Sequence, residues 1–120
     1  MGLPHAVLVT TANITDREGA IEMIMLNLDN LSCVEKFLVD GGYSGEPFAN
    51  AVKKLCGAEV EVVKRDELHK FLVLPKRWVV ERTFGWLDKT RRLWKNCERT
   101  LHNSLQILIF ALIAVLLRRF

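Results

Sequence analysis

The stretch Pro75–Arg99 holds all three tryptophans of this 120-residue chain and much of its positive charge. At about 100° per residue, most of its apolar side chains gather on one side of a helix, and Glu81 lies among basic residues on the other. The stretch contains eight Lys or Arg residues and three carboxylates, a balance of +5, whereas the whole chain carries only +3. We therefore expect an amphipathic helix that runs from Pro75 to about Cys97 and has a basic face.

A basic helix face of this kind has two interpretations. Positive charge concentrated on one element is typical of a surface that binds a polyanion such as nucleic acid. A solvated helix face that carries charge for solubility is also common. Charge alone leaves the two interpretations open.

Length and composition favour one domain. A chain of 120 residues that is 50% hydrophobic is long enough for a single core and is not typical of a disordered protein. Cys33, Cys56 and Cys97 are widely spaced, which argues against a disulfide framework or a zinc site, and the N-terminus lacks a signal-peptide pattern. We expect a cytoplasmic protein. The apolar run Ile107–Leu117 is shorter than the roughly 20 residues of a membrane span, so we expect a buried helix and no membrane partner.

Local patterns predict alternating strands and helices. The segments that favour strands are His5–Thr11, Val34–Val39, Glu59–Val63 and Phe71–Leu74. The segments that favour helices are residues 16–28, with a capping box at Thr15 and Glu18, a helix from a Ser44 cap to Gly57, the basic helix, and a last helix capped by Thr100 or Asn103. The predicted fold class is α/β, with a short mixed sheet, flanking helices and two C-terminal helices.

Asp40 stands at the end of the predicted strand Val34–Val39 and is followed by Gly41, Gly42 and Tyr43. In open α/β sheets ligands bind at the carboxyl ends of strands, and glycines let the backbone turn there. An aspartate that only opens a turn is the commoner explanation, and Tyr43 is expected to be a packing residue. Asp40 and Glu81 together could hold Mg²⁺, which takes oxygen ligands, although a two-metal site generally needs more than two carboxylates.

Two runs of residues carry a resemblance to a known family. Leu38–Tyr43 (LVDGGY) and Leu74–Leu93 (LPKRWVVERTFGWLDKTRRL) resemble the C-terminal half of the catalytic domain of DDE transposases from bacterial insertion sequences. Gly2–Ala20 looks like the segment that follows the first catalytic aspartate in that family. The resemblance covers essentially residues 1–120 as a single domain. It implies an incomplete ribonuclease-H-like fold and the cutting and joining of DNA strands at transposon ends and target sites, with Mg²⁺ or Mn²⁺ held by an Asp, Asp, Glu triad.

The resemblance also implies roles for individual residues. Asp40 matches the second aspartate of the triad and Glu81 matches its glutamate, so both are expected to be catalytic metal ligands. The residues that it implies at the DNA are Arg77, Arg82, Trp86, Lys89, Arg91, Arg92 and Lys95. Related families carry a tyrosine and a lysine where this chain has Leu74 and Asp88, and Lys89, Arg92 or Lys95 would supply the missing charge.

The first catalytic aspartate of the family has no match in this chain, because the family pattern places it just before Met1. Asp16 lies in the segment that follows that position. With two carboxylates, one bound ion cannot stabilise both the attacking and the leaving oxygen, so we expect the isolated chain to cleave little DNA and to need an upstream transposase segment or a second copy of itself. The alternative is a catalytically inactive basic DNA-binding or regulatory protein derived from a transposase. An ordinary α/β domain is a third interpretation, but it does not explain why the runs Leu38–Tyr43 and Leu74–Leu93 occur together.

Overall fold

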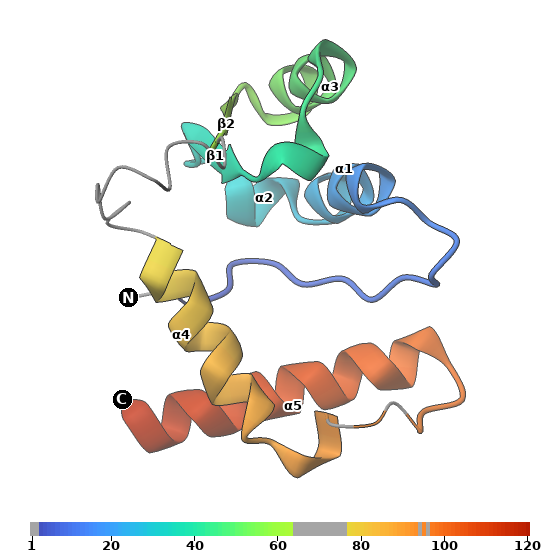
Figure 1. Ribbon diagram of the computed structural model, residues 1–120, viewed down its shortest axis with the longest axis vertical. Coiled ribbons are helices and arrows are strands. Elements are labelled where there is room, and N and C mark those ends of the chain that lie inside the picture. The colour runs from blue at the N-terminus through green and yellow to red at the C-terminus, as the bar shows by residue number, and fades with distance from the viewer. Residues whose placement is uncertain (1–2, 64–76, 94, 96) are drawn as a thin grey trace. The chain divides into compact units, whose positions relative to one another are not determined.

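The computed structural model describes residues 3–63, 77–93, 95 and 97–120. The chain divides into an N-terminal unit, His5–Leu72, and a C-terminal unit, Val73–Phe120 with Met1–Pro4. The N-terminal unit contains α1 (Asp16–Leu26), α2 (Leu28–Leu31), β1 (Lys36–Val39), the 3₁₀ turn η1 (Gly41–Tyr43), α3 (Glu46–Cys56) and β2 (Glu59–Val62) (Figure 1). The C-terminal unit contains α4 (Arg77–Asp88), the 3₁₀ turn η3 (Arg91–Leu93) and α5 (Leu101–Arg119). The predicted α/β class and the two C-terminal helices are confirmed.

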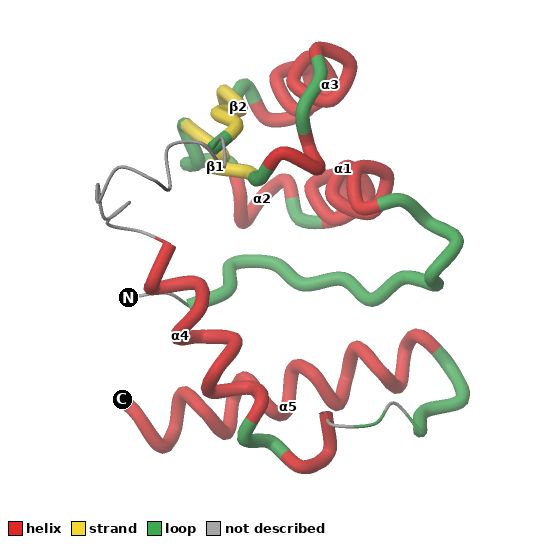
Figure 2. Tube along the Cα trace, in the orientation of Figure 1, coloured by secondary structure: helices red, strands yellow, loops and turns green. Residues whose placement is uncertain are grey.

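The sheet of the described residues consists of β1 and β2 (Figure 2), and these two strands pair in parallel. The expected mixed sheet also included Phe71–Leu74, so its mixed character stays a prediction. Lys36 lies opposite Glu59, and Val39 lies opposite Val62. Both strands alternate exposed and half-buried residues, as the charged and apolar alternation of Glu59–Val63 predicts. The two central strand predictions are therefore confirmed.

The core of the N-terminal unit lies where α1, α2 and α3 pack together beside the sheet. Its buried side chains are Ile24, Leu31, Phe48, Val52 and Ala58. Val52 is fully buried, one turn of α3 after Phe48. The i, i+4 spacing that predicts the apolar face of this helix thus matches the face that packs into the core.

Local signals set most helix ends in this unit. The Thr15 side chain accepts from the Glu18 amide and the Glu18 side chain accepts from the Thr15 amide, which confirms the capping box. Helix α3 ends at Gly57, which adopts the left-handed conformation with φ 73°. Its N-cap is Gly45 and not the expected Ser44, because the chain turns with φ 122° at that glycine.

The expected strand His5–Thr11 is wrong, since the structure assigns these residues no strand. A strand needs a hydrogen-bonded neighbour, and within the described residues β1 and β2 pair only with each other. The segment contributes side chains to the N-terminal unit in another way: Ala6 packs against the core, and Thr10 lies beside Gly19 of α1. The predicted strand Phe71–Leu74 lies outside the described residues.

The basic helix is shorter than expected. Helix α4 ends at Asp88, and the backbone then makes i→i−3 bonds, from the Thr90 amide to the Leu87 carbonyl and from the Leu93 amide to the Thr90 carbonyl. The last turn of α4 ends on Asp88 and holds no basic residue, so its charge opposes the helix dipole. The expectation of one helix to Cys97 is therefore wrong, while its expected beginning at Pro75 lies outside the described residues.

Helix α5 has the expected length but is less buried than expected. Thr100 caps it by accepting from the Asn103 amide at 3.2 Å, which confirms one of the two proposed caps. By length and composition alone its 19 residues could cross a membrane, a criterion that core helices of soluble proteins also meet. Only Ala111 and Leu112 are buried, whereas Phe110 and Leu117 are 65% and 81% exposed. The expectation of a buried helix is therefore wrong for most of its length.

Candidate functional site

Asp40 ends the first strand and caps the turn that follows it. Its Oδ1 accepts a hydrogen bond from the Gly42 amide at 2.9 Å, and its carbonyl accepts from the Tyr43 amide at 3.1 Å. The residue is exposed, and among the described residues its second carboxylate oxygen, Oδ2, has no hydrogen-bond partner. The turn therefore fixes the carboxylate through one oxygen and leaves the other open to solvent.

The absence of a side chain at Gly42 permits this geometry. A Cβ atom added at Gly42 would lie 3.1 Å from the Asp40 Oδ1 atom, closer than most real contacts, whereas at Gly41 it would meet nothing within 4 Å. The Gly42 carbonyl also accepts from the Arg17 Nε atom at 2.9 Å. Gly42 is thus held through its amide by Asp40 from within the turn, and through its carbonyl by Arg17 from the first turn of α1.

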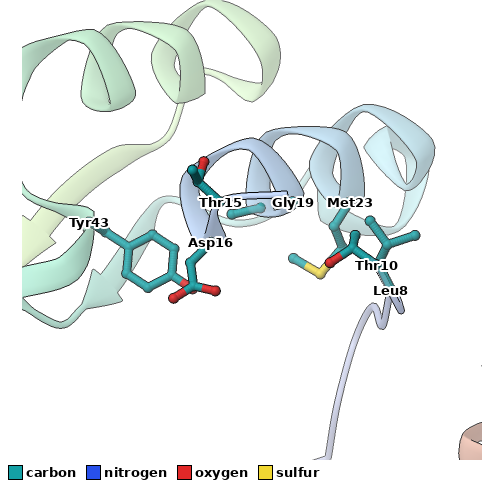
Figure 3. Close-up of a pocket in the computed structure, with 8 residues that line it drawn as sticks. Leu8, Thr10, Thr15, Asp16, Gly19, Met23 and Tyr43 are labelled. Carbon is teal, nitrogen blue, oxygen red and sulfur yellow. The ribbon is translucent and has the colours of Figure 1, made fainter. Parts of the chain in front are cut away.

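Tyr43 closes the same turn. Its ring packs against Phe48 with centroids 5.5 Å apart and an interplanar angle of 52°, so the expectation of a packing residue is confirmed. Burial raises the pKa of the Tyr43 hydroxyl, and the Asp16 and Asp40 carboxylates raise it further. Figure 3 shows the Asp16 carboxylate pointing toward Tyr43, at an open hollow of about 220 Å³ that these two residues line with residues of α1 and the N-terminal segment.

Glu81 lies on α4 and is exposed. It belongs to the C-terminal unit and Asp40 to the N-terminal unit, so their convergence on one metal stays a prediction. Within the described ranges, no three His, Cys, Asp or Glu residues gather closely enough to hold a metal ion. The donor chemistry still suits a hard divalent cation, because both residues offer exposed carboxylates and Asp40 is already oriented by its turn.

Arg82 lies between two tryptophans of its own helix. The guanidinium carbon is 4.6 Å from the ring centre of Trp78, one turn before it, and 4.8 Å from that of Trp86, one turn after it. Such contacts between a guanidinium and an aromatic face stabilise by about 0.5–1 kcal/mol each at exposed sites. Arg82 and Trp86 were both expected to contact DNA, and the structure shows that they pack against each other.

The other expected DNA-binding residues lie along α4 and the turns after it. Arg77 begins α4 and Arg91 begins η3, and their side chains fall outside the described part of the structure. Arg92 pairs with Glu98 at 2.7 Å, and Lys89 and Lys95 are exposed. Nothing in the structure tests their contact with DNA, which stays a prediction.

The sequence interpretation missed two members of this cluster. Trp78 stands at i−4 from Arg82, a spacing that the sequence displays and that predicts the contact. Arg119, from the last turn of α5, has its guanidinium carbon 5.1 Å from the Trp86 ring centre. No local pattern predicts that contact, because 32 residues separate Trp86 and Arg119 along the chain.

Comparison with known proteins gives two matches. The sequence model of a family described as "Transposase DDE domain" matches residues 1–117. The chain is 32% identical over 105 residues to a Burkholderia cepacia protein named "Putative transposase for insertion sequence element IS402", over 82% of this chain and 49% of that protein. The chain therefore spans about half the length of this curated relative. No solved structure matches.

Proposed function

The chain belongs to the DDE transposases of insertion sequences, and from this premise we propose that it is the C-terminal part of a catalytic domain that cuts and joins DNA strands at transposon ends. The observation that carries the proposal is the Asp40 turn. An exposed carboxylate, oriented by its own backbone, stands at the carboxyl end of a parallel strand, where ligands of open α/β sheets bind. Membership of this family supports a role for that carboxylate as a metal ligand.

Transposases of this family generally use divalent metal ions. Asp40 and Glu81 would hold such an ion, Mg²⁺ or Mn²⁺, through carboxylate oxygens. Once bound, the ion supplies charge that polarises the phosphate and lowers the pKa of an attacking water. Asp40 suits this role because the Gly42 amide fixes one of its oxygens and leaves Oδ2 for the ion.

The basic residues of α4 and the following turns would bind the DNA backbone. They surround Glu81 in sequence, so a phosphate held by them would lie near the proposed ligand. The proposed action on bacterial insertion-sequence DNA is also consistent with the cytoplasmic location expected from the sequence. The fold that the family implies, ribonuclease-H-like, is compatible with the parallel pair β1 and β2 and stays part of this proposal.

A cleavage assay tests the proposal. We expect no cleavage of labelled transposon-end DNA in Mg²⁺ or Mn²⁺ by the isolated chain, because its proposed ligands are two carboxylates. We expect cleavage when the chain is produced with its upstream coding sequence, and loss of that cleavage in Asp40→Asn and Glu81→Gln. Cleavage by the longer protein that survives both substitutions would refute the assignment of the site.

The second candidate is a basic DNA-binding or regulatory protein that has lost catalysis. It is favoured by the excess of basic residues in Pro75–Arg99, since such residues would bind DNA phosphates without a metal. Its affinity for DNA in EDTA should fall with salt, by a slope of about −0.9 in log affinity against log salt for each phosphate contact. DNA binding without any cleavage, with the upstream segment present, would select this candidate over the enzyme.

A further inference from the structure

Arg17 connects helix α1 to the turn that carries Asp40. Its Nε atom donates to the Gly42 carbonyl at 2.9 Å, and the amide of the same glycine donates to the Asp40 Oδ1 atom, also at 2.9 Å. Within the described residues, Arg17 makes the one side-chain hydrogen bond to the turn Gly41–Tyr43 that comes from another helix or strand. The proposed metal ligand is therefore linked to α1 through a single glycine.

The turn depends on such support because two of its three residues are glycines. Glycine adopts more backbone conformations than any other residue, so Gly41 and Gly42 do not by themselves fix the direction of the Asp40 carboxylate. The bonds at the Gly42 amide and carbonyl hold the peptide groups on both sides of its α-carbon. Together they restrict both backbone angles of Gly42 and keep in place the amide that orients Asp40.

Helix formation alone does not favour an arginine at position 17. The N-terminal end of a helix carries partial positive charge, so a cation in the first turn is unfavourable there, whereas the carboxylates of Asp16 and Glu18 in the same turn are favourable. Arg17 is exposed, and it forms no ion pair with any carboxylate of the described residues. The bond to Gly42 is the polar contact that the structure gives this side chain.

We propose that Arg17 is a positioning residue, which orients Asp40 for the divalent metal ion by holding Gly42. The inference rests on the proposed function, because it takes Asp40 as a metal ligand. Arg17 acts through the turn and does not contact the ion. Residues that orient a metal ligand in this indirect way typically change metal affinity by about 10–100-fold when they are substituted. Arg17 is exposed, so we expect the lower end of this range.

The charge of Arg17 predicts the opposite effect. A guanidinium at the same turn as Asp40 repels a divalent cation, so removal of that charge would strengthen metal binding. Loss of an orienting hydrogen bond would weaken it. The direction of the change in metal affinity therefore separates the positioning role from simple electrostatics.

Two substitutions separate the hydrogen bond from the charge. The side-chain amide nitrogen of glutamine is as many bonds from the backbone as the Nε atom of arginine, so Arg17→Gln keeps an N–H donor at that place and removes the charge. Arg17→Met keeps a side chain that reaches the same place and removes both the donor and the charge. Lys53→Ala is the control, since it removes an exposed positive charge from the last turn of α3 in the same unit.

The test titrates Mn²⁺ into the full chain and follows free Mn²⁺ by its electron paramagnetic resonance signal, well below the melting temperature of each variant. We expect Arg17→Met to weaken Mn²⁺ affinity about tenfold relative to the unsubstituted chain. Arg17→Gln should recover most of that loss, because it restores the donor to the Gly42 carbonyl. Lys53→Ala should bind Mn²⁺ at least as tightly as the unsubstituted chain. Thermal unfolding without metal is measured on the same variants.

Three outcomes would overturn the inference. Unchanged or tighter Mn²⁺ binding by Arg17→Met would do so, and a lowered melting temperature of that variant would then make the bond purely structural. Equal weakening in Arg17→Gln and Arg17→Met would show that the donor does not matter. If the unsubstituted chain binds no Mn²⁺, or if Asp40→Asn binds it equally well, the proposed metal site fails too; if Asp40→Asn loses the ion and Arg17→Met keeps it, only the role of Arg17 fails.

Discussion

Asp40 has two separable roles, and a pair of substitutions distinguishes them. Its Oδ1 caps the 3₁₀ turn through the Gly42 amide at 2.9 Å, and its charge is the proposed metal ligand. Asp40→Asn keeps an oxygen acceptor at the same place and removes the charge. Asp40→Ala removes both, so it should lose about 1 kcal/mol of capping free energy that the asparagine variant keeps. For a chain of this length that is about 4 °C in melting temperature.

The metal role is measured on the same variants. A divalent ion that binds only the folded chain stabilises it by RT ln(1 + [L]/Kd), about 1.4 kcal/mol at ten times the Kd. We expect Mg²⁺ or Mn²⁺ to raise the melting temperature of the unsubstituted chain, and Asp40→Asn and Glu81→Gln each to abolish that rise. Asp29→Asn, which removes an exposed carboxylate from α2, is the control and should keep it.

Three results would refute this reasoning separately. Equal melting temperatures for Asp40→Asn and Asp40→Ala without metal would show that the capping bond contributes nothing. A metal-dependent rise that persists in Asp40→Asn would remove Asp40 from the ligand set. Loss of the metal-dependent rise in Asp29→Asn as well would show that the ion stabilises the chain through its net charge and not through binding at one site.

Three further predictions concern the N-terminal unit. Thr15→Ala should lower the free energy of unfolding by about 1 kcal/mol in urea titration, because α1 loses its cap. Gly42→Ala should destabilise the chain more than Gly41→Ala in the same titration, because only the former brings a Cβ to 3.1 Å from the Asp40 Oδ1 atom; equal effects would contradict this. Because the pKa of Tyr43 is raised in the folded chain, the neutral hydroxyl contributes its full stability below the unfolded pKa of about 10, and that contribution is lost as pH rises through the folded pKa. Tyr43→Phe cannot ionise, so above pH 10 it should unfold less readily than the parent chain, with little difference between the two at pH 7.

The parts of the fold that follow from neighbours in sequence were predictable. The capping box of Thr15 and Glu18 involves residues three apart, and Gly57 ends α3 by its own conformational freedom. The segment His5–Thr11 has the composition of a strand, but a strand exists only with a neighbour, and pairing is decided by residues far along the chain. The early end of α4 was in principle visible, because Asp88 places negative charge at the negative end of the helix dipole.

In the candidate site, too, contacts between residues close in sequence were predictable and contacts between distant residues were not. The Trp78, Arg82, Trp86 stack follows from i, i+4 spacing on one helix, although the sequence interpretation gave Arg82 and Trp86 to the DNA and overlooked the contact between them. Arg119 contacts Trp86 only because α5 packs on α4, and no local sequence pattern predicts that packing. The hydrogen bond from Arg17 to the Gly42 carbonyl is equally remote, since it joins residues 25 apart.

The Asp-Gly-Gly-Tyr motif has a structural explanation for three of its members. Asp40 caps the turn, Gly42 has no Cβ to crowd that cap, and Tyr43 packs on Phe48. A chain that had lost catalysis would keep these residues for folding, so the motif is expected in the enzyme and in the inactive DNA-binding protein alike. The two proposals differ in the use of Asp40 Oδ2, which has no partner within the described residues. Asp40→Asn preserves the cap, the glycine and the packing, and therefore isolates the metal chemistry from everything else that the motif does.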